Sequence, residues 1–225
     1  MAITERAFEA VDLPYDDFEP RTDRTSSVAR LAALHAEAET TARLANLLGR
    51  SIVAAAALTG IAGLTIAAGM TGINESLSWA VLIMLGIGAM ARCYRTAISS
   101  PFLRESLENF ARQLTPIMLY CGFAWGAGAF LALPAETSLI GTVLFVGAPV
   151  FAVALLLREQ APVLSFAFPL LALSSFAALL RPLPDGAMAA ALMLMTGAVI
   201  LLPLLTLERR RLASRLIPAI AELTR

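Results

Sequence analysis

Charged side chains are missing from the middle of each of six long apolar runs in this 225-residue sequence. The runs are Ile52–Met70, Leu77–Tyr94, Leu114–Leu133, Ser138–Leu157, Ala161–Leu180 and Ala187–Leu207. Ionisable groups at membrane depth are costly, and proteins that keep them there use them in proton relays, ion sites or substrate sites. Their absence argues against an ion-coupled pump.

Histidine and cysteine are also scarce, with one histidine and two cysteines in the chain. A haem, a non-haem metal centre or an intramembrane metalloprotease needs several strong ligands, which His35 alone cannot provide. We interpret His35 as a solvated helix residue. Cys93, next to Arg92, is either a reactive or acylated thiol or, in the simpler interpretation, an ordinary interfacial residue. The sequence therefore predicts no cofactor, no metal ion and no enzymatic activity.

Lysine is absent, and the 17 arginines are distributed unevenly. Each apolar run has about 20 residues, the length at which a helix crosses the ~30 Å hydrocarbon layer of a bilayer. With the N-terminus in the cytoplasm, 16 of the 17 arginines fall on the cytoplasmic side and Arg181 alone falls outside. Because positive charge is retained in the cytoplasm, this bias sets the orientation. The sequence predicts an all-α polytopic membrane helical bundle with six transmembrane helices and both termini cytoplasmic.

The overall composition indicates the same class of protein. Apolar residues make up 58% of the chain and charged residues 15%, which is typical of a multi-pass membrane protein. The net charge is zero, and no basic stripe points to nucleic acid as a partner. We expect the protein in the inner membrane of a bacterial cell, with membrane lipids among its partners.

The sequence pattern divides the chain into four segments. Residues 1–25 carry seven acidic residues against three arginines, so we expect a disordered acidic tail there. This tail is either a solvated extension or a short docking peptide. Residues 26–50 predict a cytoplasmic amphipathic helix, residues 51–207 the six-helix transmembrane domain, and residues 208–225 a basic juxtamembrane helix.

The cytoplasmic segments predict surfaces for lipids or proteins. The 26–50 helix has one weakly apolar face, formed by Leu31, Leu34, Ala38, Thr41, Ala45 and Leu48. That face lies on the membrane surface, packs on the bundle or pairs with a second copy. A further amphipathic helix is expected along the cytoplasmic face between Arg95 and Gln113. The juxtamembrane arginines are expected to bind anionic lipid headgroups: Arg209, Arg210 and Arg211.

The third apolar run contains the most distinctive short motif. Gly122 and Gly126 form a G-x-x-x-G match, which allows two helices to approach closely. Trp125 lies between them in the sequence, near the middle of the predicted span. It either lines a small apolar ligand groove with Tyr120 and Phe123 or fills the space that the glycines leave.

Prolines and small residues recur in the other runs. Pro149, Pro169 and Pro203 are expected to kink the fourth, fifth and sixth helices, as hinges or as tolerated distortions. Trp79 is expected at the outer membrane–water interface. A stripe of small residues predicts the packing face of the first helix: Ala55, Thr59, Gly63 and Ala67.

The residues from 122 to 134 read Gly-Phe-Ala-Trp-Gly-Ala-Gly-Ala-Phe-Leu-Ala-Leu-Pro. Together with the Arg-rich inner loop before it, this stretch resembles the multi-span membrane input regions of bacterial diguanylate cyclases and sensor histidine kinases. The similarity in layout covers residues 92–207. It implies a sensor module without an output domain in this sequence, acting through a separate protein. No catalytic residue carries over, because such input regions have none.

Three functions follow as hypotheses. The first is a non-enzymatic membrane module that senses or anchors and works through a partner protein. The second is a structural or assembly subunit of a membrane complex, in which the small-residue stripes contact other subunits. The third is a small transporter of a neutral or apolar solute, formed by one copy or by a homo-oligomer.

Overall fold

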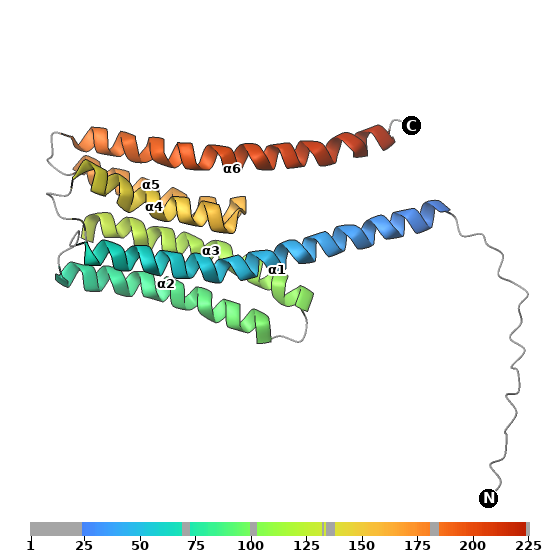
Figure 1. Cartoon of the computed structure of the whole chain (residues 1–225), viewed down its shortest axis with the longest axis horizontal. Coiled ribbons are helices and arrows are strands. Elements are labelled where there is room, and N and C mark those ends of the chain that lie inside the picture. Colours follow the sequence, from blue (N-terminus) through green and yellow to red (C-terminus); the bar gives the residue numbers. More distant parts are fainter. Residues whose placement is uncertain are drawn as a thin grey trace, which may run out of the picture. The chain divides into compact units, whose positions relative to one another are not determined.

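The structure is a computed structural model that describes residues 24–68, 73–99, 103–131, 133, 138–180 and 185–223. This part of the chain contains no β-strand and consists of six helices (Figure 1): α1 (Arg24–Ala67), α2 (Ile73–Ser99), α3 (Leu103–Leu131), α4 (Leu139–Leu157), α5 (Gln160–Leu180) and α6 (Gly186–Leu223). All six are long and apolar enough to cross a membrane. The prediction of an all-α chain with six potential membrane helices is confirmed.

The chain divides into two compact units, residues 1–40 and residues 41–225. In the first unit, the described side chains from Arg30 to Thr40 are all exposed, including the apolar Leu31 and Leu34. The Thr40 hydroxyl donates to the Glu37 carbonyl at 2.8 Å, a bond within the helix. Residues 1–23 of the expected acidic tail lie outside the described residues.

The second unit is organised around α3. This helix packs against α2 on one side and α5 on the other, and α5 in turn packs against α6 (Figure 1). The short helix α4 packs against both α5 and α6. Residues of α1 between Leu47 and Ala62 belong to the same buried core as these five helices. The most extensive helix contact in this bundle joins α3 and α5, which are not consecutive in the chain.

The buried face of α1 differs from the predicted one. Ala54, Leu58 and Ala62 are buried, at the three-to-four-residue spacing of one helix face. Of the predicted small-residue stripe only Ala55 is buried, and a side-chain carbon added at Gly63 would meet nothing within 4 Å. The buried face of α1 is therefore centred one residue earlier than the predicted stripe, on positions 54, 58 and 62.

Two helix boundaries also differ from the sequence pattern. The segment between Arg95 and Gln113 is not a separate interfacial helix, since α2 continues to Ser99 and α3 begins at Leu103. Helix α6 runs to Leu223, so it includes Pro203 and the basic segment that was expected as a juxtamembrane helix. The side chains of Arg209, Arg210 and Arg211 lie outside the described residues.

Helices α4 and α5 are joined by a link of two residues, Arg158 and Glu159. Arg158 adopts the left-handed conformation, with φ 54° and ψ 12°, and caps the C-terminus of α4. Its Nε also donates to the Leu155 carbonyl at 3.2 Å, which satisfies one of the last carbonyls of the helix. This reversal directs α5 back along α4.

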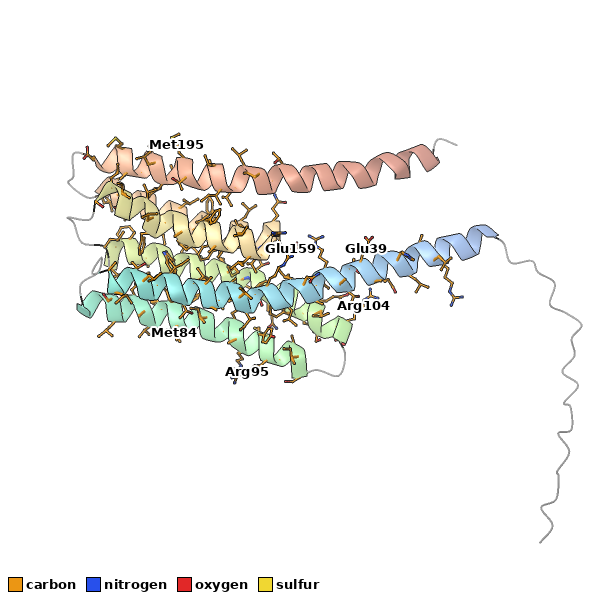
Figure 2. The ribbon with its side chains drawn as sticks, viewed as in Figure 1. Glu39, Met84, Arg95, Arg104, Glu159 and Met195 are labelled. Atoms are coloured by element: carbon orange, nitrogen blue, oxygen red, sulfur yellow. The ribbon has the colours of Figure 1, made fainter. Side chains whose placement is uncertain are left out.

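The outer surface of the bundle is apolar. Leu64, Ile140, Phe168 and Val199 are each at least 68% exposed, which a water-facing surface does not tolerate over such an area. Met84 and Met195 lie on this surface, whereas Arg95, Arg104 and Glu159 gather at one end of the bundle (Figure 2). An exposed apolar surface with charged residues at one end is consistent with a multi-pass membrane protein.

Glycines allow the closest helix contacts in the bundle. A side-chain carbon added at Gly122 would lie 2.2 Å from the Phe166 carbonyl oxygen of α5, and one at Gly126 would lie 2.9 Å from Cβ of Leu173. Four other glycines make similar close contacts, since a side-chain carbon added at each would lie within 3.1 Å of a side chain on the facing helix. These pairs are Gly86 with Cys121, Gly128 with Trp79, Gly147 with Thr196 and Gly197 with Leu171. Absence of a side chain is therefore what lets α3 approach both neighbours.

We expect Gly122→Ala to destabilise the folded bundle by about 1–3 kcal/mol, because the new methyl group overlaps backbone atoms of α5 that cannot move aside. Gly63→Ala is the matched control, because its methyl group enters open space on α1 and should change stability by less than about 0.5 kcal/mol. Unfolding of the purified protein in mixed micelles measures both. Equal stabilities of the two variants would contradict the close α3–α5 contact.

Candidate functional site

The centre of the bundle contains a hydrogen bond between a side chain and a backbone carbonyl. The indole Nε1 of Trp125 in α3 donates to the carbonyl oxygen of Phe145 in α4 at 2.9 Å. In an α-helix that carbonyl would accept from the N–H four residues later, and here that residue is Pro149, which has none. Trp125 thus supplies the donor that Pro149 removes. The Phe145 carbonyl is therefore paired although it is buried.

Trp125 also belongs to a cluster of three aromatic rings, which we call the aromatic core: Trp79, Trp125 and Phe145. The ring of Trp79 lies 5.4 Å from that of Trp125 at an interplanar angle of 82°, an edge-to-face contact. The Phe145 ring lies 5.4 Å from Trp79 and 6.0 Å from Trp125. Helices α2, α3 and α4 therefore meet through one continuous aromatic contact.

The placement of Trp79 corrects the sequence prediction. The side chain was expected at the membrane–water interface, but it is fully buried between the helices. Gly128 of α3 makes this possible, because a side-chain carbon there would lie 2.4 Å from the Trp79 indole nitrogen. Position near a helix end predicts the depth of a tryptophan but not which face of its helix it occupies.

The predicted ligand groove is divided between two faces of α3. Gly122 and Gly126 face α5, and the space beside them is occupied by that helix. Tyr120 instead lies against Gly86 of α2, and its hydroxyl donates to the Leu82 carbonyl at 3.2 Å. Phe123 is 49% exposed on the outer surface. The structure therefore does not bring Tyr120 or Phe123 together with Trp125.

The three predicted hinge prolines lie in different surroundings. Pro149 and Pro169 are buried inside α4 and α5, while Pro203 is exposed on α6. Helix α3 contains a further proline, Pro116, that the sequence interpretation did not single out. The carbonyl that Pro149 leaves without its usual backbone donor accepts from the indole of Trp125.

An ion pair ties α1 to the link between α4 and α5. The guanidinium of Arg43 donates through Nε and Nη2 to the two carboxylate oxygens of Glu159, a bidentate arrangement. The two residues are 116 positions apart in the sequence, so no local pattern could have identified the pair. The geometry is planar and directional, which fixes the approach of α1 more closely than a point charge would.

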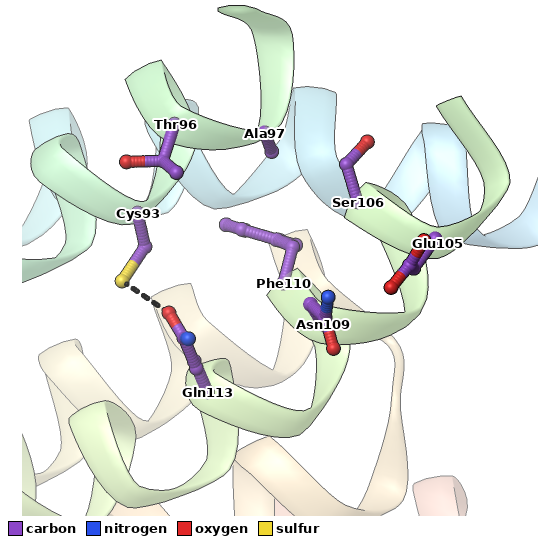
Figure 3. A pocket seen from close by; sticks show the side chains of 8 residues that line it. All are labelled: Cys93, Thr96, Ala97, Glu105, Ser106, Asn109, Phe110 and Gln113. Carbon is purple, nitrogen blue, oxygen red and sulfur yellow. Dashed lines mark hydrogen bonds between the residues drawn. The ribbon is translucent and has the colours of Figure 1, made fainter. Parts of the chain in front are cut away.

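A pocket of about 290 Å³ opens between the C-terminal part of α2 and the N-terminal part of α3 (Figure 3). Its apolar floor is made by Ala97 and Phe110, which are buried. Its remaining lining is polar: Cys93, Thr96, Glu105, Ser106, Asn109 and Gln113. Within it the Cys93 thiol donates to Oε1 of Gln113 at 3.0 Å. This lining was not predicted, although Cys93 itself was noted.

The described side chains do not form a metal centre of the usual kind. Among residues 30–68, 76–99, 104–131, 138–180 and 185–203, no three His, Cys, Asp or Glu side chains come together. His35 lies on the exposed part of α1, with Nδ1 3.2 Å from the Leu31 carbonyl oxygen.

Comparison of the chain with protein-family models, with curated proteins and with solved structures found no match. The functional interpretation consequently rests on the residues and contacts described above. The resemblance to bacterial input regions stays a prediction from the sequence.

We expect Trp125→Phe to destabilise the protein by about 1–3 kcal/mol, because the buried Phe145 carbonyl loses the indole donor that replaces the missing N–H of Pro149. In the Pro149→Ala background the backbone N–H returns, and the same substitution should cost clearly less. A double-mutant cycle in micelles measures this coupling, and packing losses common to both backgrounds cancel. Additive effects of the two substitutions would contradict the assigned role of Trp125.

Proposed function

We propose that this protein is a non-enzymatic module of the bacterial inner membrane that senses or anchors and acts through a partner protein. The observation that carries the proposal is the bidentate pair between Arg43 and Glu159. It connects the bundle to α1, and α1 is a single helix from Arg24 to Ala67. A change in the packing of α4 and α5 can therefore reach α1 at Arg43.

The proposal requires an element with two packing arrangements, and α4 is the candidate. Helix α4 carries Pro149 and depends on Trp125 of α3 for one of its hydrogen bonds. A ligand or a membrane change that separates α3 from α4 breaks that bond and frees the adjoining Arg158–Glu159 link. Such a signal acts only if its source binds the two arrangements with different affinities.

The distribution of charge supports cytoplasmic output. Arginines of α2 and α3 lie at the same end of the bundle as Glu159 (Figure 2). Helix α6 continues from Pro203 to Leu223, about 30 Å at the rise of an α-helix. With this end in the cytoplasm, the polar segments of α1 and α6 are the surfaces that a partner would contact.

Charge reversal tests the coupling and the partner together. We expect Arg43→Glu and Glu159→Arg each to reduce recovery of a stoichiometric partner from native membranes, measured by affinity capture and quantitative mass spectrometry. The double reversal recreates the ion pair with opposite polarity and should restore recovery. Arg50→Glu, on the same helix and also exposed, is the matched control.

Each outcome distinguishes the hypotheses. A partner that is lost in the single reversals and regained in the double supports the sensor or anchor. A partner held at constant stoichiometry in all variants favours a structural subunit of a complex. A homo-oligomer with no other protein overturns the proposal and favours solute transport, which flux measurements in reconstituted vesicles would then test.

The orientation has its own test. We expect a green fluorescent protein fused after Arg225 to fluoresce, and alkaline phosphatase fused in the 181–186 connection to be active, because the arginine bias retains both termini in the cytoplasm. Phosphatase fused after Arg225 is the matched control and should be inactive. Activity of that control fusion would reverse the assigned orientation.

A further inference from the structure

The pocket between α2 and α3 differs from the rest of the bundle because it is polar. It is formed where the two helices diverge, with Cys93 and Thr96 on one wall and Glu105, Asn109 and Gln113 on the other (Figure 3). Phe110 reaches from α3 toward α2 and closes the bottom. A volume of about 290 Å³ holds a small organic molecule rather than a single water or a bare ion.

The charge of the lining selects the ligand. Glu105 is the charged residue among the eight that line the pocket, and its carboxylate has no hydrogen-bond or ion-pair partner among the described side chains. Glu105 lies in the first turn of α3. The pocket therefore presents a negative charge to an incoming group.

Among the described residues, no arginine forms an ion pair with this carboxylate. Arg104 pairs with Glu108 at 3.2 Å, on the next turn of α3. Arg112 donates to Oδ1 of Asn109 at 2.7 Å. A cationic ligand is thus favoured over an anionic one, and the ring of Phe110 on the floor suits an ammonium group as well.

The two amide side chains add a second requirement. Oδ1 of Asn109 accepts from Arg112, and Oε1 of Gln113 accepts from Cys93. Both amides therefore have their N–H₂ groups left to donate. A complementary ligand carries an ammonium group for Glu105 and an oxygen acceptor a few bonds away for Asn109 or Gln113.

We infer that this pocket binds an ethanolamine-type group, a primary ammonium with a neighbouring oxygen. Two sources carry this chemistry: the headgroup of phosphatidylethanolamine and a free amino alcohol. The surrounding arginines of α2 and α3 place the pocket at the expected depth of lipid headgroups in the inner leaflet. The site is independent of the partner-binding surfaces proposed above.

Cys93 reports on occupancy, because it lines the pocket while Cys121 is buried. The full-length protein is reconstituted into vesicles of phosphatidylglycerol alone or mixed with phosphatidylethanolamine, and alkylation by N-ethylmaleimide is followed by mass spectrometry. We expect the mixed vesicles to slow alkylation of Cys93 by about threefold or more, since a site filled two thirds of the time leaves the thiol open for one third. Glu105→Gln should abolish this protection.

Glu37→Gln is the control, because Glu37 is an exposed acid outside the pocket lining, whereas loss of the Glu108 carboxylate would release Arg104 beside Glu105. For this control variant, the ratio of the Cys93 alkylation rates in the two vesicle types should equal the ratio for the unmodified protein. Protection by free ethanolamine added to phosphatidylglycerol vesicles identifies a soluble amine as the ligand. Protection only in the mixed vesicles identifies the lipid headgroup.

Two results overturn the inference. The first is an equal alkylation rate of Cys93 under all three conditions. The second is protection that persists in Glu105→Gln, which would show that the lipid shields the thiol without binding at the carboxylate. Because Glu105 is exposed, its substitution leaves the fold intact, and the unchanged reactivity of buried Cys121 verifies this in the same spectra.

Discussion

The bundle depends on how an unpaired backbone carbonyl is satisfied inside an apolar environment. Pro149 removes the donor for Phe145, and the indole of Trp125 replaces it from the neighbouring helix. In water a solvent molecule would serve, but hydrocarbon offers none. The relation between α3 and α4 is consequently fixed by one directional bond, and the edge-to-face contact with Trp79 extends that constraint to α2. Helices α2, α3 and α4 are thus held together by the Trp125–Phe145 hydrogen bond and the aromatic contact with Trp79.

Close approach explains the remaining contacts. Lipid tails are as apolar as leucine, so helices in a bilayer associate through packing and interhelical hydrogen bonds rather than through the hydrophobic effect. Gly122, Gly126 and Gly128 give α3 two faces without side chains, one toward α5 and one toward α2. Tyr120 adds a hydroxyl contact with the Leu82 carbonyl. The central position of α3 follows from this concentration of small residues in one helix.

Much of the fold could be predicted from the sequence, because hydrophobic run length and the absence of internal charge act locally and are legible residue by residue. Which face of each helix is buried could not be predicted from the sequence. Trp79 was expected at the membrane surface and is buried, whereas Gly63 was expected in a helix contact and faces open space. Burial of a residue depends on which helix packs against it, and the local sequence does not specify that helix. The Arg43–Glu159 pair and the pocket around Glu105 join segments that are distant or separated by a turn, so their partners are defined only in three dimensions.

The two-residue link between α4 and α5 also constrains how the molecule is assembled during synthesis. A connection formed by Arg158 and Glu159 is too short to separate the two helices, so in a bilayer they would enter together as one hairpin. That hairpin finds its docking groups already present, because Arg43, Trp125 and the glycines of α3 precede it in the chain. Helix α6, which packs on α4 and α5, can join only afterwards. During synthesis the residues of α1 and α3 are therefore made before the α4–α5 hairpin that contacts them, and α6 is made last.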